Sequence, residues 1–130
     1  TPCGTLFPYT TLFRSIASGK TTARIFQDAY RLVHRLHNEF PETPVGLIAA
    51  KPSLARWHLR DQYVRLNQTL ASYADTLEWL YFIDVWYPAL NEQGNPREST
   101  FLEDGIHMNP KGYSVWRKKI HSKLEEMGIE

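Results

Sequence analysis

Two patterns of apolar residues alternate along most of the chain. In three segments the apolar residues recur every three or four positions, which predicts amphipathic helices. In two shorter segments, residues 45–50 and 81–85, the apolar residues run almost without interruption, as expected of strands buried on both faces of a parallel sheet. The order helix, strand, helix, strand, helix predicts an α/β fold with right-handed crossovers.

The predicted helices have recognisable starts. Thr21 or Thr22 can cap the first helix, and the second covers about residues 59–77. The third begins with Asn109 as the N-cap and Pro110 as the first helical residue. The positions expected to face inward are, helix by helix, Ile25, Phe26, Ala29, Leu32, Val33, Leu36 and Phe40; Tyr63, Leu66, Leu70, Tyr73, Ala74 and Leu77; and Tyr113, Trp116, Ile120, Leu124 and Met127.

A carboxylate and an imidazole lie on one short turn just before the third helix. Asp104 and His107 are three residues apart, and Gly105 between them allows the chain to turn tightly. The carboxylate can therefore hydrogen-bond to one nitrogen of the imidazole while the other nitrogen points outward. This pair is the base half of a hydrolase triad.

Two other interpretations of Asp104 and His107 stay open. In one, Asp104 only satisfies backbone amides in a turn before a helix. In the other, the pair binds a metal ion, although one carboxylate and one histidine leave most of a coordination shell unfilled. The residues around the pair favour the catalytic interpretation, and we expect neither a metal nor an organic cofactor.

The segment from Asp104 to Tyr113 resembles the last signature block of the SGNH hydrolases, also called GDSL-type esterases and lipases. In that block Asp-x-x-His is followed by Pro or Asn and by Gly before the C-terminal helix. The matching residues are, in order, Asp104, His107, Asn109, Pro110, Gly112 and Tyr113. The resemblance extends from Ile16 to the end of the chain, and residues 44–53 and 81–85 resemble the family's fourth and fifth strands.

The resemblance implies a three-layer, doubly wound α/β fold of the flavodoxin-like kind, of which this chain would hold about two core strands and three helices. It also implies that an upstream serine attacks an ester carbonyl, that His107 takes the proton of this serine, and that Asp104 fixes the imidazole tautomer. The substrate would be a small-molecule carboxylic ester, such as an acetylated sugar, a lipid or another acyl ester.

The segment after the first predicted strand offers candidate residues for the cleft. Open α/β sheets bind ligands beyond the carboxyl ends of their strands, so we expect Ser53, Arg56 and Trp57 to border the site. Ser53 is not expected to be the nucleophile, because it lacks the glycine-flanked turn that exposes a nucleophilic serine.

The N-terminal residues are expected to be foreign to the fold. Residues 5–15 match one translated frame of a widely used DNA-sequencing adapter, so residues 1–15 are interpreted as a non-native leader and residues 16–130 as the C-terminal part of a single hydrolase domain. By the resemblance, the serine and the glycine and asparagine of the oxyanion hole would then be missing. Two alternatives remain: a non-catalytic homologue that binds a ligand in the cleft, and a truncated reading frame with no function of its own.

Composition argues against several classes of function. The net charge of +1, with 22% charged residues, gives no electrostatic case for binding nucleic acid or an anionic membrane. No apolar run approaches the roughly 18–20 residues of a membrane-spanning helix. The one cysteine, Cys3, lies in the leader, so the rest of the chain can form neither a disulfide nor a cysteine metal site. Oligomeric state and cellular location are left open.

Overall fold

The computed structural model describes the backbone of residues 5–7 and the whole of residues 16–129. Its helices and strands are, in order, β1 (Thr5–Phe7), α2 (Thr22–Glu39), β2 (Val45–Ile48), α3 (Arg60–Ala74), β3 (Leu80–Ile83) and α4 (Pro110–Glu126). Single 3₁₀ turns lie at Trp57–Leu59, Tyr87–Ala89 and Glu98–Thr100. The three strands form one parallel sheet in the order β1-β2-β3.

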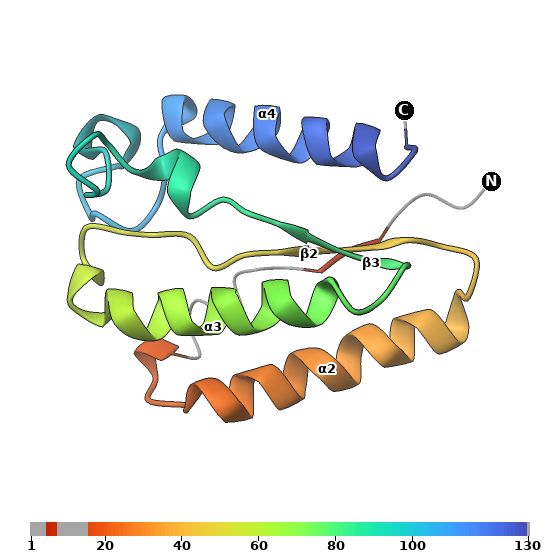
Figure 1. The fold of residues 1–130 in the computed structure, drawn as a ribbon. Coiled ribbons are helices and arrows are strands. Elements are labelled where there is room, and N and C mark those ends of the chain that lie inside the picture. The colour runs from red at the N-terminus through yellow and green to blue at the C-terminus, as the bar shows by residue number, and fades with distance from the viewer. Residues whose placement is uncertain (1–4, 8–15, 130) are drawn as a thin grey trace.

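Helices cover both faces of this sheet. Helices α2 and α3 lie side by side on one face, and α4 lies on the other (Figure 1). Two successive crossovers that have the same hand and move along the sheet in the same direction place both connecting helices on one face. The helix after the last strand is then free to cover the opposite face. The expected three-layer, doubly wound α/β arrangement is therefore confirmed.

The alternation of side chains along β2 divides the core into two clusters. Val45 and Leu47 pack with the buried residues of α2 and α3, whereas Ile48 packs on the side of α4. The first cluster includes Ile25, Ala29, Val33, Tyr63, Leu66 and Leu70, and the second includes Ile83, Val85, Phe101, Met108 and Trp116. All four residues of β2 are buried, as its uninterrupted apolar run predicts.

The N-caps of α2 and α4 are those predicted from the sequence. The Thr21 hydroxyl accepts a hydrogen bond from the amide of Arg24 at 3.2 Å. The Asn109 side chain accepts one from the amide of Gly112 at 3.1 Å, and a proline occupies the first turn of α4. Each cap satisfies one of the amides that a helix start leaves without a partner.

The predicted inner face of α4 needs one correction, at Tyr113. This side chain is 49% exposed, whereas Gly112 and Trp116 are buried. Residues 112 and 116 are four positions apart and define the stripe that faces the sheet. Tyr113 lies about 100° around the helix from Gly112, so its ring projects past the covered stripe.

Strand β2 ends two residues earlier than predicted because a side chain takes over its backbone pairing. The amide of Ala50 donates to Asn67 Oδ1 at 2.9 Å, and Asn67 Nδ2 donates to the carbonyl of Ala50 at 3.0 Å. Asn67 belongs to α3 and is 8% exposed. Its amide group pairs both backbone groups of a buried residue, as an adjacent strand would otherwise do.

Strand β1 lies in the segment that the sequence analysis excludes from the fold. The structure pairs Thr5–Phe7 in parallel with the first three residues of β2, so the sheet has three strands rather than two. Such pairing uses backbone groups only, and the open edge of β2 can therefore bind an extended segment of little specific sequence. The interpretation of residues 1–15 as a non-native leader stays a prediction, because the side chains of these residues lie outside the described part of the chain.

Candidate active site

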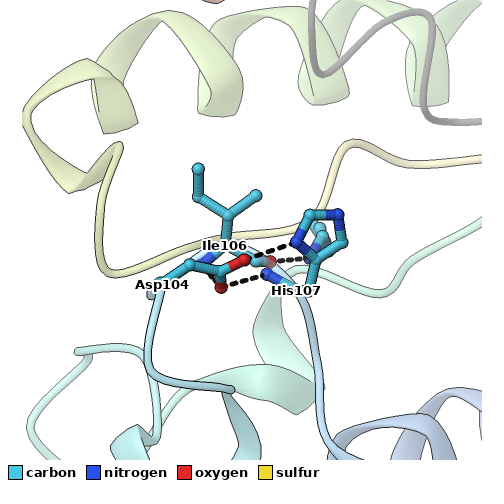
Figure 2. Close-up of polar contacts among 4 residues, drawn as sticks. Asp104, Ile106 and His107 are labelled. Atoms are coloured by element: carbon cyan, nitrogen blue, oxygen red, sulfur yellow. Dashed lines mark hydrogen bonds and ion pairs between the residues drawn. The ribbon is translucent and has the colours of Figure 1, made fainter.

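Asp104 and His107 are joined by a side-chain hydrogen bond. His107 Nδ1 lies 2.6 Å from Asp104 Oδ2. The other carboxylate oxygen, Oδ1, accepts the backbone amides of Ile106 at 2.9 Å and of His107 at 3.0 Å (Figure 2). An ionised carboxylate can only accept hydrogen bonds, so Nδ1 must carry the proton of a neutral imidazole. Nε2 is then left with a free lone pair, which is what a general base needs.

These hydrogen bonds also control the charge of Asp104. The bond from the His107 ring is the largest of the effects that hold the pKa of the Asp104 carboxyl well below its usual range, followed by the bonds from the two backbone amides. Asp104 is therefore ionised at neutral pH. Only the ionised form can fix the tautomer that leaves Nε2 unprotonated.

The pair lies on the surface rather than in the core. The side chain of His107 is 64% exposed and that of Asp104 is 45% exposed. The imidazole can therefore be reached by a substrate or by another part of a larger protein.

The turn that carries the pair is packed against the loop that follows β2. The amide of Ala55 donates to the carbonyl of Gly105 at 3.0 Å, and the ammonium of Lys51 donates to the carbonyl of Ile106. Gly105 has a φ of 68°, and a Cβ atom there would lie 3.2 Å from Leu54 Cβ. Only glycine fits this position without strain. The contacts place the pair beyond the carboxyl end of β2, where open α/β sheets carry their ligand sites.

The base of the same turn is closed by its own backbone. The amide of Leu102 donates to the carbonyl of His107 at 2.8 Å, and the amide of Asn109 donates to the carbonyl of Thr100 at 2.9 Å. The side chain of Asn109 also donates to the carbonyl of Ser99 at 2.7 Å. The turn is therefore tied to the segment before it as well as to the start of α4.

The three residues expected to border the cleft occupy different environments. Ser53 is 2% exposed, and its hydroxyl accepts the amide of Arg56 at 3.3 Å, so it closes a local turn and does not open onto solvent. Arg56 is half-buried. Trp57 is half-buried and lines an open hollow of about 600 Å³, together with Leu54 and residues 91 and 95–99.

Lys51 is a residue near the site whose role the sequence analysis missed. It is 5% exposed, and its ammonium lies 5.6 Å from the centre of the Phe101 ring. Burial lowers the pKa of Lys51 to about 8, although the nearby charge of Asp104 opposes this change. The available signal was a lysine that directly follows a buried apolar run.

The metal interpretation of the Asp104 and His107 pair finds no further ligands in the described part of the chain. No group of three or more histidine, cysteine, aspartate or glutamate side chains is placed there to hold a metal ion. In the described residues no helix is long and apolar enough to cross a membrane.

Comparison with known proteins assigns the family. A sequence model described as the GDSL-like Lipase/Acylhydrolase family matches residues 14–115, which include both members of the pair. The chain therefore belongs to the GDSL-like lipase and acylhydrolase family, and the resemblance to the SGNH, or GDSL-type, hydrolases is confirmed. No curated protein sequence matches the chain.

Several solved structures share this fold. A candidate platelet activating factor from Streptococcus pneumonia aligns with a TM-score of 0.75 and 16% identity, over 93% of this chain and 58% of that one. A candidate acylhydrolase from Bacteroides fragilis aligns with a TM-score of 0.66 and 20% identity, over 84% of this chain and 54% of that one. A GDSL-like lipase from Bacteroides thetaiotaomicron aligns with a TM-score of 0.65 and 17% identity, over 84% of this chain and 55% of that one. Identities this low show the fold alone, and the chain spans between 54% and 58% of these proteins.

Proposed function

We propose that this chain carries the histidine and aspartate of a serine esterase site, and that the serine belongs to a part of the domain outside residues 16–130. The observation that carries the proposal is the hydrogen bond of 2.6 Å between His107 Nδ1 and Asp104 Oδ2 in an exposed turn. It directs the lone pair of Nε2 outward, and family membership supports an ester as the substrate.

In the proposed reaction the serine hydroxyl attacks the ester carbonyl carbon while Nε2 of His107 takes the hydroxyl proton. The negative charge of Asp104 stabilises the imidazolium that forms. The tetrahedral intermediate then expels the alcohol, which receives the proton from Nε2, and leaves an acyl-enzyme. Water repeats the sequence, with His107 again as base and then as acid, and releases the carboxylic acid. These steps use no metal or organic cofactor.

Two observations support an external nucleophile. Within the described residues, the ring of His107 is hydrogen-bonded to Asp104 and shares no hydrogen bond with a serine hydroxyl. Ser53, in the loop after β2, is buried and engaged with the amide of Arg56. The chain spans only 54–58% of the structural neighbours, and this greater length of the neighbours supports the proposal that the nucleophile lies in a further part of the domain.

The first test is hydrolysis of a short-chain chromogenic ester by the 130-residue chain. Loss of one triad member typically costs a factor on the order of 10⁴ to 10⁶ in rate. We therefore expect hydrolysis no faster in the presence of the chain than in the presence of its His107→Ala variant, which controls for the reactivity of other surface groups. Activity that Ser53→Ala abolishes would place the nucleophile within this chain and contradict the proposal.

A further inference from the structure

Lys51 is a buried lysine that directly contacts the turn of the candidate active site. It lies three residues after the end of β2, and 5% of its surface is exposed. Its ammonium donates a hydrogen bond to the backbone carbonyl of Ile106, the residue before His107. The ring of Phe101, with its centre 5.6 Å from Nζ, covers the ammonium from another side.

A lysine at this position is costly to the fold unless its charge is well satisfied. Removing an ammonium from water disfavours its charged form, and burial lowers the pKa of Lys51 to about 8. The carbonyl of Ile106 and the face of the Phe101 ring offset part of this cost. An apolar side chain would avoid the cost but could not bind the carbonyl.

The peptide group that Lys51 contacts is held from both of its ends. Its carbonyl belongs to Ile106 and accepts from Lys51, while its N–H belongs to His107 and donates to Asp104 Oδ1 at 3.0 Å. In a trans peptide the C=O and N–H point in opposite directions, so these two partners together fix the orientation of the peptide plane. This plane sets the direction in which the His107 side chain leaves the backbone.

We propose that Lys51 is a positioning residue of the esterase site, because its ammonium fixes the peptide between Ile106 and His107 and so maintains the bond between His107 Nδ1 and Asp104. The catalytic part of this inference rests on the proposed function. The clamp itself belongs to this chain and can be measured in it without any enzymatic activity.

The test is the protonation of the His107 ring, followed by ¹⁵N NMR in the 130-residue chain at neutral pH. In the wild type we expect the proton on Nδ1, where Asp104 accepts it. Lys51→Met keeps an unbranched side chain only one heavy atom shorter but removes all donors, and should move the proton toward Nε2, the form favoured by an unconstrained imidazole. Lys51→Arg should restore the wild-type tautomer, and Lys118→Met, on the exposed surface of α4, should leave it unchanged.

The outcomes separate the clamp from general stability. A folded Lys51→Met variant that keeps the proton on Nδ1 would overturn the proposal, even if it unfolds at a lower temperature. If Lys51→Met does not fold, the proposal is tested by a measurement on the wild type. Nuclear Overhauser contacts from the Lys51 ε-methylene group to the Phe101 ring and to residues 106 and 107 are then expected, and their absence would overturn the clamp.

Failure of the clamp can be distinguished from failure of the proposed function. In an active complete protein, Lys51→Met should lower kcat more than it raises KM, with recovery in Lys51→Arg. A complete protein that has no esterase activity but shows the expected response of the His107 tautomer would refute the proposed function and leave the clamp standing.

Discussion

A Cβ atom on Gly105 would lie 3.2 Å from Leu54 Cβ, at a position where the backbone φ is 68°. The turn that carries Asp104 and His107 therefore approaches the loop after β2 so closely that a Cβ atom would be crowded, and its positive φ also favours glycine. The hydrogen bond of 3.0 Å from the amide of Ala55 to the carbonyl of Gly105 spans the same contact. The candidate site is thus built from two loops that are far apart in the sequence.

Gly105→Ala should destabilise the chain by about 1–3 kcal/mol, because it combines an unfavourable positive φ with crowding against Leu54. Gly94→Ala is the matched control, since Gly94 has a φ of 81° and no atom within 4 Å of its Cβ position. The control should lose only about 1 kcal/mol. Urea unfolding measures both values. Equal losses in the two variants would contradict the close packing of the two loops.

Asn109→Ala should cost about 1–3 kcal/mol of unfolding free energy, because it removes both the N-cap of α4 and the bond to the Ser99 carbonyl. Asn109→Asp keeps the cap but loses the amide donor, so it should retain part of this free energy. Thr21→Ala, which removes a cap alone, should cost about 1 kcal/mol. A loss in Asn109→Asp as large as that in Asn109→Ala would show that the cap contributes nothing.

Asp104 should make stability depend on acid pH. A carboxyl whose pKa is lowered in the folded state contributes stability that is fully present above its unfolded pKa of about 3.9 and is lost as the pH falls through the folded pKa. The difference in unfolding free energy between the wild type and Asp104→Asn should therefore shrink between pH 5 and pH 2.5. A difference that stays constant over this range would contradict the bonding of Asp104 in the folded chain.

Lys51 should produce a trend of the same sign in alkali, because its pKa is also lowered in the folded state. Its pKa falls to about 8 in the folded state, so between pH 8 and about 10.4 the unfolded chain binds more protons and stability rises with pH. The rise should stay below about 1.4 kcal/mol per pH unit and should be absent from Lys51→Met. Burial also raises the pKa values of Tyr63 and Tyr73, so these tyrosines make stability depend on pH near their ordinary pKa of about 10. Measurements are therefore best made below pH 10. If the unfolding free energy of the wild type and that of Lys51→Met rise equally with pH, Lys51 is not buried.

Local signals predict the parts of the fold that depend on neighbouring residues. The caps at Thr21 and Asn109 lie within three residues of the amides that they satisfy, so sequence spacing reveals them. The Asp104 and His107 pair is equally local. Sequence spacing could therefore indicate the pair, its hydrogen bond and the helix that follows.

The features that could not be predicted depend on contacts between distant segments. The end of β2 is decided by Asn67, 17 residues beyond the Ala50 that it pairs. The role of Lys51 depends on a carbonyl 55 residues away. Neither contact leaves a periodic pattern in the sequence. Strand β1 could not be predicted either, because backbone pairing at an open sheet edge needs little information from side chains.

The central claim, that His107 is the general base of a serine esterase, is tested most directly by ester hydrolysis in a longer protein that joins residues 16–130 to the proposed part of the domain with the serine. The measurement compares kcat/KM for a short-chain ester in that protein and in its His107→Ala variant, with His121→Ala as a control on an exposed histidine of α4. The account predicts a loss on the order of 10⁴ to 10⁶ for His107→Ala and none for His121→Ala. An active protein whose rate is unaffected by His107→Ala would contradict it.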